Sequence, residues 1–149
     1  METFQQKLIF SKVIGLDTSV FIYHLESYEK YRSVTRQIFT SIEHGDCSAI
    51  TSVLTLLELN VRPFQLKKPE VAHHYEILLV NFPNLKIVDV DREISRKAAQ
   101  LRAKYNIRTP DAIQMATCIL KGSKFYLTND KDLAKLNKEI EIGFLDDLA

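Results

Sequence analysis

The sequence has 149 residues, of which 46% are hydrophobic and 26% are charged, and its formal net charge is +1. These values favour one globular domain over residues 1–149 with a sizeable core, and they exclude a low-complexity chain. The small net charge is no indication of a nucleic-acid binder, although an acidic site and a basic rim would cancel in the sum.

The two cysteines and the first residues bear on the cellular compartment. Cys47 and Cys118 lie in different segments without the spacing of a zinc site or a disulfide framework, so we expect reduced thiols. The start, METFQQKLIFSKVIGL, lacks the layout of a signal peptide, and its apolar run is too short to cross a bilayer. A soluble cytoplasmic protein without membrane contact is therefore expected.

The first half of the chain alternates short apolar segments with helical patterns. KVIGL (12–16) predicts a buried strand, and TSVFIYHL (18–25) the helix after it. Segment 33–45 has apolar residues at helical spacing and a stop at Gly45. CSAI (47–50) predicts a second strand, and TSVLTLLELNV (51–61) a helix that begins at Thr51 or Ser52, both good N-caps.

The second half continues the alternation. Helices are predicted at 69–82, at the amphipathic segment 92–105, at 111–122 and, in a short form, at 130–137. Strands are predicted at KIVDV (86–90), KFYLT (124–128) and IEIGFL (140–145). Strands that alternate with helices predict a three-layer α/β/α domain with a central, mostly parallel sheet of about five strands.

Two carboxylates directly follow predicted strands. Asp17 comes after strand 12–16, and Asp130 comes after strand 124–128. In parallel sheets, ligand chemistry gathers at the carboxyl ends of the strands. An Asp before a helix is also a common N-cap, so a structural explanation remains open for both residues.

Two further carboxylates stand in unusual places on helices. Glu58 is the only charged residue from Ser48 to Val61, so it either lies on the exposed edge of its helix or faces a site with a compensating positive charge. Asp111 follows Thr109, a candidate N-cap, and Pro110. An acid in a first turn favours the helix dipole by about 0.3–1 kcal/mol, which alone accounts for Asp111.

If the sheet brings these four acids together, their mutual repulsion calls for a cation. Clusters with only oxygen ligands suit Mg²⁺ or Mn²⁺, and the expected chemistry is metal-assisted hydrolysis of phosphodiester bonds. Asp132 is a fifth candidate, less well placed than its neighbour Asp130.

Basic and aromatic residues offer candidate substrate contacts. Lys97, Lys104 and Arg108 fall at spacings that predict one phosphate-binding stripe leading toward Asp111, or else a solvated helix face. Arg32 and Arg36, on an earlier helix, are weaker candidates. Candidates for stacking on a base are Tyr23 and Tyr28.

Four stretches, in order, make the sequence resemble PIN-domain proteins, and among them the VapC-type toxins of toxin–antitoxin pairs. They are LDTSVFIYHLE, TSVLTLLEL, IVDVDREISRKAAQLRAKYNIRTPDAIQMATC and FYLTNDKDL, which together extend over nearly the whole chain. The resemblance implies an acidic catalytic and metal-binding quartet of Asp17, Glu58, Asp111 and Asp130, supported by Thr18, Ser19, Thr109, Thr128 and Asn129. It also implies an endoribonuclease dependent on Mg²⁺ or Mn²⁺, typically a homodimer, whose site a small antitoxin covers.

The sequence departs from this pattern at its start, where about ten residues precede the first strand and many relatives begin almost at once. We therefore expect residues 1–11 to be an N-terminal extension, which would be a flap, a dimer contact or an overlong start. Three functions remain open: a toxin ribonuclease, a PIN-like RNA-processing nuclease or phosphatase-like hydrolase without toxin biology, and a non-catalytic RNA- or protein-binding module.

Overall fold

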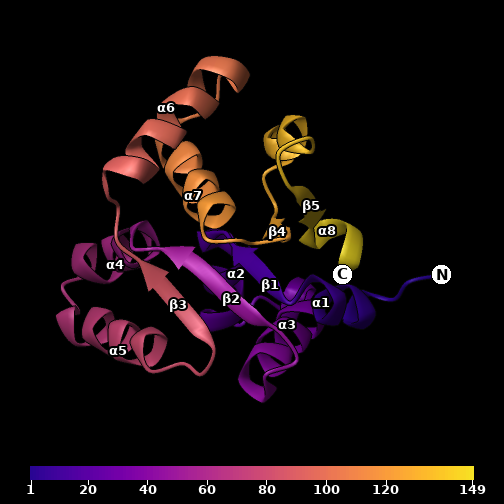
Figure 1. Ribbon diagram of the computed structural model, residues 1–149. Helices are drawn as coiled ribbons and strands as arrows, with labels where there is room; N and C mark the ends of the chain where they lie inside the picture. Colours follow the sequence, from indigo (N-terminus) through magenta and orange to yellow (C-terminus); the bar gives the residue numbers. More distant parts are fainter.

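A five-stranded parallel sheet forms the middle layer of the protein (Figure 1). The computed structural model describes residues 1–149. The sheet has the order β3-β2-β1-β4-β5, and every neighbouring pair is parallel. Its strands are β1 (Val13–Leu16), β2 (Ser48–Ser52), β3 (Leu85–Val88), β4 (Phe125–Thr128) and β5 (Glu141–Phe144). The predicted three-layer α/β/α architecture is confirmed.

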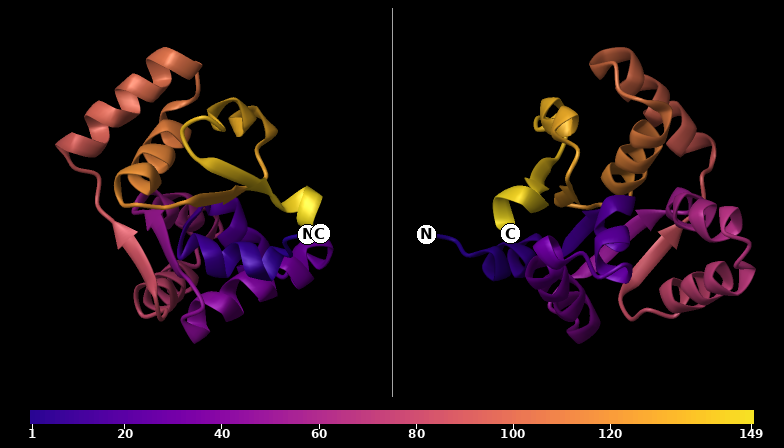
Figure 2. Two further views of the ribbon diagram at one scale, coloured as in Figure 1. Left: turned by 45° about the vertical axis from the view of Figure 1, so that its right-hand side comes forward. Right: turned by 180° about the vertical axis from the view of Figure 1, so that it is seen from behind.

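Helices cover both faces of the sheet (Figures 1 and 2). One face carries α1 (Phe4–Ser11), α2 (Thr18–Leu25), α3 (Arg32–His44), α4 (Leu54–Gln65) and α5 (Pro69–Val80). The other face carries α6 (Arg92–Tyr105) and α7 (Thr109–Leu120). The remaining elements are η1 (Glu29–Tyr31), η2 (Lys131–Leu136) and α8 (Leu145–Leu148). None of the helices combines the length and apolarity that a membrane span requires.

Each face of the sheet has its own core, because successive strand residues point to opposite faces. Ile14 and Leu16 of β1 pack among the first five helices, whereas Ile50 and Tyr126 pack against α6 and α7. The two cysteines are buried and free.

Two predicted helix starts were wrong. Thr51 and Ser52 continue β2 and pair with Ile87 and Val88 of β3, so α4 begins only at Leu54. Thr109 is the first residue of α7, and Arg108 occupies the N-cap position. Pairing with β3 extends the strand through Thr51 and Ser52, and the extended backbone of Arg108 makes that residue the N-cap of α7.

The residues before β1 form a helix that the sequence analysis did not assign. Thr3 and Gln6 make a capping box at the start of α1. Leu8 is fully buried in the core between α1, α3 and the sheet. Lys7 forms an ion pair with Glu141 of β5. Residues 4–11 are therefore an integral part of the packed layer.

Gly15 of β1 provides a test of how closely α7 packs on the sheet. A Cβ atom there would stand 2.7 Å from Sγ of Cys118 and 2.9 Å from Cδ1 of Tyr126. We expect Gly15→Ala to lower the free energy of unfolding by about 1–3 kcal/mol through overpacking, as measured by urea denaturation. Adding Cys118→Ala, which removes the nearest atom, should restore part of that loss. Unchanged stability of Gly15→Ala would contradict the packing.

Candidate active site

An open cavity of about 410 Å³ lies at the carboxyl ends of β1 and β4. All four predicted acids line it, and they come from four elements or their flanks. Asp17 and Asp130 follow neighbouring strands, while Glu58 arrives on α4 from one face of the sheet and Asp111 on α7 from the other. The remaining lining residues are Thr18, Ser19, Ile22, Tyr23, Arg108 and Asn129.

Asp17 is the most tightly held of the acids. Its Oδ1 accepts the backbone N–H of Thr18 at 2.7 Å, which caps α2, and its Oδ2 accepts the hydroxyl of Thr128 at 2.5 Å. Burial raises the pKa of Asp17 to about 6, and repulsion from Asp111 and Glu58 adds to the rise, while the two hydrogen bonds oppose it. The carboxylate of Asp17 therefore both caps α2 and lines the cavity.

Thr128 links Asp17 to Asp130. Its Oγ1 donates to Asp17 and accepts the backbone N–H of Asp130 at 3.1 Å. Asp130 Oδ1 then accepts the N–H of Asp132 at 3.0 Å and caps η2. The side chain of Asp132 lies outside the cavity, where its Oδ2 stands 3.3 Å from Nζ of Lys135.

Asp111 carries an ion pair with Arg108. The Nε of Arg108 donates to Oδ2 of Asp111 at 3.1 Å, and the arginine side chain is 77% exposed whereas the aspartate is 13% exposed. Burial raises the pKa of Asp111, and the arginine lowers it without cancelling that effect. Arg108 is thus the cation that the cavity itself supplies.

Glu58 is exposed on α4, and its carboxylate accepts a hydrogen bond from a buried hydroxyl. Thr18 Oγ1 donates to Glu58 Oε1 at 2.7 Å and lies 3.2 Å from Oγ1 of Thr55. Gln114 Nε2 donates to that same Thr55 oxygen at 3.0 Å, and Gln114 Oε1 accepts the N–H of Ser52 at 2.7 Å. Thr18, Thr55 and Gln114 are all buried. A hydrogen-bonded chain therefore connects the core to this carboxylate.

Thr55 and Gln114 were not predicted as site residues, although the sequence contains a signal for both. Each is a polar residue inside a largely apolar helical segment, the same criterion that singled out Glu58. Thr51, also buried, belongs to this group, since its hydroxyl oxygen lies 2.6 Å from that of Thr55 and 2.9 Å from Leu16 O.

Asn129 is held in the cavity by residues that no local pattern indicated. Its Nδ2 donates to Oη of Tyr31 at 2.9 Å, and its Oδ1 accepts the N–H of Asp146 at 3.0 Å. The Tyr31 ring stacks on Tyr23, with centroids 4.2 Å apart, and Tyr23 lines the cavity. The C-terminal segment therefore helps to form the wall of the site.

Besides Asp132, three more predicted site residues lie outside the cavity. Thr109 lines a separate hollow together with Ser95. Lys97 and Lys104 both contact Glu139, with Nζ–carboxylate distances of 3.8 and 3.4 Å, and neither lines the acidic cavity. Of the expected phosphate-binding stripe, only Arg108 reaches the site.

The cavity offers only oxygen ligands, the type that Mg²⁺ and Mn²⁺ prefer. No three carboxylate, imidazole or thiol groups stand close enough to hold one ion together in this arrangement. Arg108 binds Asp111, and Thr18 binds Glu58. Mg²⁺ in proteins often takes only one or two carboxylates and keeps several waters. The Ser19 hydroxyl, buried beside the cavity without a hydrogen-bond partner, is one more available oxygen. The residues therefore fit a partly hydrated ion.

Comparison with known proteins gives a family and a set of similar folds. The family model described as PIN domain matches residues 14–139. The structure of VapBC2 from Rickettsia felis bound to a DNA fragment from its promoter has a TM-score of 0.69 at 15% identity, covering 89% of this chain and 98% of that chain. A toxin–antitoxin complex from Klebsiella pneumoniae has a TM-score of 0.65 at 21% identity, with coverages of 89% and 97%.

DNA-bound VapBC from Salmonella typhimurium also has a TM-score of 0.65, at 19% identity and with coverages of 89% and 97%. At such identities the likeness concerns the fold alone. No curated protein sequence is a significant match to the chain.

The raised pKa of Asp17 predicts a pH-dependent stability of the metal-free protein. Between its usual value of 3.8 and about 6, the folded state binds a proton at Asp17 that the unfolded chain releases. The free energy of unfolding therefore falls as the pH rises through this range and levels off above it. We expect Asp17→Asn to be about 1–3 kcal/mol more stable than wild type at pH 7.5, and no more stable at pH 4.

Urea denaturation in EDTA at both pH values measures this difference. Asp89→Asn, at an exposed position, is the matched control and should change stability by less than about 0.5 kcal/mol. Destabilisation by Asp17→Asn at pH 7.5 would contradict the predicted cost of burying this carboxylate.

Proposed function

The chain belongs to the PIN-domain family, and on that premise we propose that it is a metal-dependent endoribonuclease of the VapC type, the toxin of a toxin–antitoxin pair. The proposal is carried by the convergence of Asp17, Glu58, Asp111 and Asp130 on one cavity. A helix cap or a helix dipole accounts for a single acid, but neither requires four acids from separate elements to face the same space.

The carboxylates would hold a partly hydrated Mg²⁺ or Mn²⁺, some directly and others through its waters, with Asp17 as the central ligand because its burial makes an uncompensated charge costly. When bound, the ion would lower the pKa of an attacking water and neutralise charge on the phosphate. Thr128 keeps Asp17 and Asp130 in fixed relation, and Thr18 orients Glu58. The exposed guanidinium of Arg108 is available for a phosphate oxygen of the RNA once it leaves Asp111.

An apolar surface on α4 supports a protein partner. Leu57, Val61 and Phe64 are each exposed and line a groove of about 520 Å³. Exposed apolar patches of this kind mark protein–protein contacts. We propose that a small antitoxin and a second copy of the chain, in a cytoplasmic homodimer, cover such surfaces. The similar folds of proteins solved as toxin–antitoxin complexes support this part of the proposal.

A second candidate function is a non-catalytic RNA-binding module. The Arg108–Asp111 ion pair favours it, because the pair occupies one of the four candidate ligands. An intact set of four acids in one cavity favours the enzyme, and an activity measurement separates the two.

We expect purified protein to cleave an RNA pool in Mn²⁺ or Mg²⁺ and to be inactive in EDTA. Asp17→Asn should lower the cleavage rate by at least about a hundredfold, because it removes the central ligand, whereas Asp89→Asn should cleave like wild type. RNA binding without cleavage by folded wild type would favour the binding module. Equal cleavage by wild type and Asp17→Asn would place the activity outside this site.

The buried hydroxyl chain predicts a second effect on cleavage. Thr55→Val should reduce the rate about tenfold through misplacement of Glu58, and Thr55→Ser, which keeps the hydroxyl, should restore it. In a Glu58→Gln background, Thr55→Val should cause little further loss, as a double-mutant cycle would measure. Full additivity of the two losses would show that Thr55 acts independently of Glu58.

A further inference from the structure

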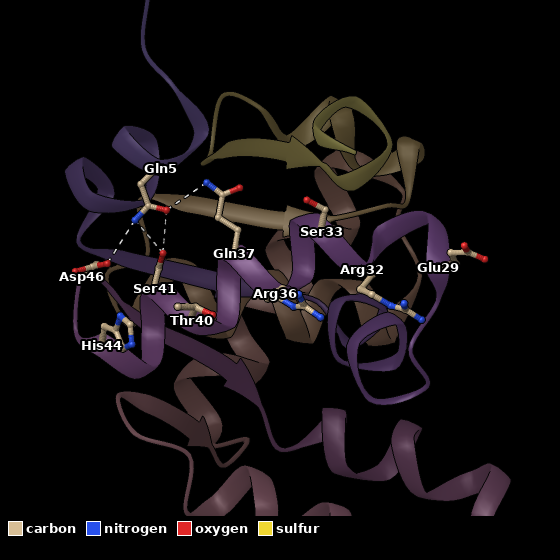
Figure 3. Close-up of a pocket in the computed structure, with 10 residues that line it drawn as sticks. All are labelled: Gln5, Glu29, Arg32, Ser33, Arg36, Gln37, Thr40, Ser41, His44 and Asp46. Carbon is tan, nitrogen blue, oxygen red and sulfur yellow. Dashed lines mark hydrogen bonds between the residues drawn. The ribbon is translucent and has the colours of Figure 1, made fainter.

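A second hollow, of about 690 Å³, lies along α3 and shares no lining residue with the acidic cavity (Figure 3). Its lining contains no apolar residue. Arg32, Arg36, Thr40 and His44 recur at every fourth position of α3 and are exposed, so they form one stripe along the helix. The hollow is therefore a polar groove along α3, and two arginines of this stripe line it.

Gln5 of α1 lies against α3 along one edge of this groove and forms hydrogen bonds there. Gln5 Nε2 donates to Ser41 Oγ at 3.0 Å and to Asp46 Oδ2 at 3.4 Å, and Gln5 Oε1 accepts from Gln37 Nε2 at 3.2 Å (Figure 3). These bonds leave the two arginines outside the network. The segment before β1 thus completes the groove.

The arginines of the groove are free of ion pairs. Arg32 and Arg36 contact no carboxylate, whereas Lys97 and Lys104 both contact Glu139. Two carboxylates do line the groove, but they lie at its opposite ends: Glu29 before α3 and Asp46 after it (Figure 3). The two arginines and two carboxylates of the lining balance in formal charge, but the arginines are unpaired and therefore available to an anion.

An aromatic cluster joins this groove to the acidic cavity. Tyr31, the residue before α3, stacks on Tyr23 of the cavity wall. Tyr28 lies beside Tyr23, with centroids 5.0 Å apart, and is 44% exposed. Because Tyr28 packs on Tyr23 and directly precedes Glu29 of the α3 groove, its exposed ring offers a stacking surface for a base of a single strand.

From these observations we propose that the α3 groove holds the phosphodiester backbone of single-stranded RNA beyond the cleavage site, with Arg32 and Arg36 as its phosphate contacts. The proposal rests on the proposed ribonuclease function and locates the substrate on α3, where the sequence had favoured α6. An RNA backbone fits better than a protein segment, because phosphates need cations and hydrogen-bond donors, whereas a protein interface needs apolar contacts that the groove lacks.

The test is binding of a fluorescently labelled single-stranded RNA of about 12 nucleotides, followed by anisotropy in EDTA over a range of salt concentrations. Arg32→Gln/Arg36→Gln is compared with Lys97→Gln/Lys104→Gln, which removes the same charge from another helix. We expect the arginine pair to weaken binding about tenfold and to reduce the slope of log K against log salt by about 1.4, the value for two lost single-strand phosphate contacts. The lysine pair should stay within about twofold of wild type. Circular dichroism verifies that both variants are folded.

The outcomes separate this proposal from the proposed function. If the wild-type protein binds RNA in this way but never cleaves it, the result would contradict the ribonuclease function. It would still support RNA binding by the α3 groove. If the double arginine variant binds RNA like wild type, or if both double variants lose the same affinity, the proposed RNA-binding role of the groove would be overturned. This holds even if the wild-type protein cleaves RNA. Unchanged RNA binding combined with lost binding of polyglutamate would overturn it in favour of an acidic protein partner.

Discussion

The site depends on the parallel pairing of β1 with β4. Leu16 pairs with Leu127, and the N–H of Asp17 donates to Leu127 O at 3.0 Å, so the ladder extends one residue beyond β1. The carboxylate of Asp17 then meets the hydroxyl of Thr128, which also binds the backbone of Asp130. Because neighbouring parallel strands end at the same edge, these two acids are held together, and α4 and α7 add the other two from opposite faces.

That arrangement has an electrostatic cost which the rest of the site partly offsets. Burial makes the ionised form of Asp17 unfavourable, and the nearby carboxylates add repulsion. Arg108 supplies one positive charge, at Asp111, and buried hydroxyls supply donors to Glu58. A bound divalent ion would supply the remaining positive charge. Protein sites that lose stability in this way are commonly functional ones.

Much of this could be predicted from the sequence, because strand ends and lone charges in apolar segments are local patterns. The bounds of α2 and α6 match their predictions, and the four acids do line one cavity. The errors arise where contacts distant in sequence decide the outcome. Pairing with β3 keeps Thr51 in a strand, Glu139 holds the lysines of α6, and α8 positions Asn129. No local pattern carries that information. Arg32 and Arg36 can be named from the sequence, but only the structure shows that they form no ion pair and line one groove.

The claim that the acids form a metal site is tested most directly by anomalous diffraction from crystals of the protein soaked in Mn²⁺. The account predicts a strong anomalous peak in the cavity within coordination distance of Asp17, with Asp111 turned from Arg108 toward the ion or its waters. A cavity without a peak at saturating Mn²⁺, with Arg108 still bound to Asp111, would contradict it.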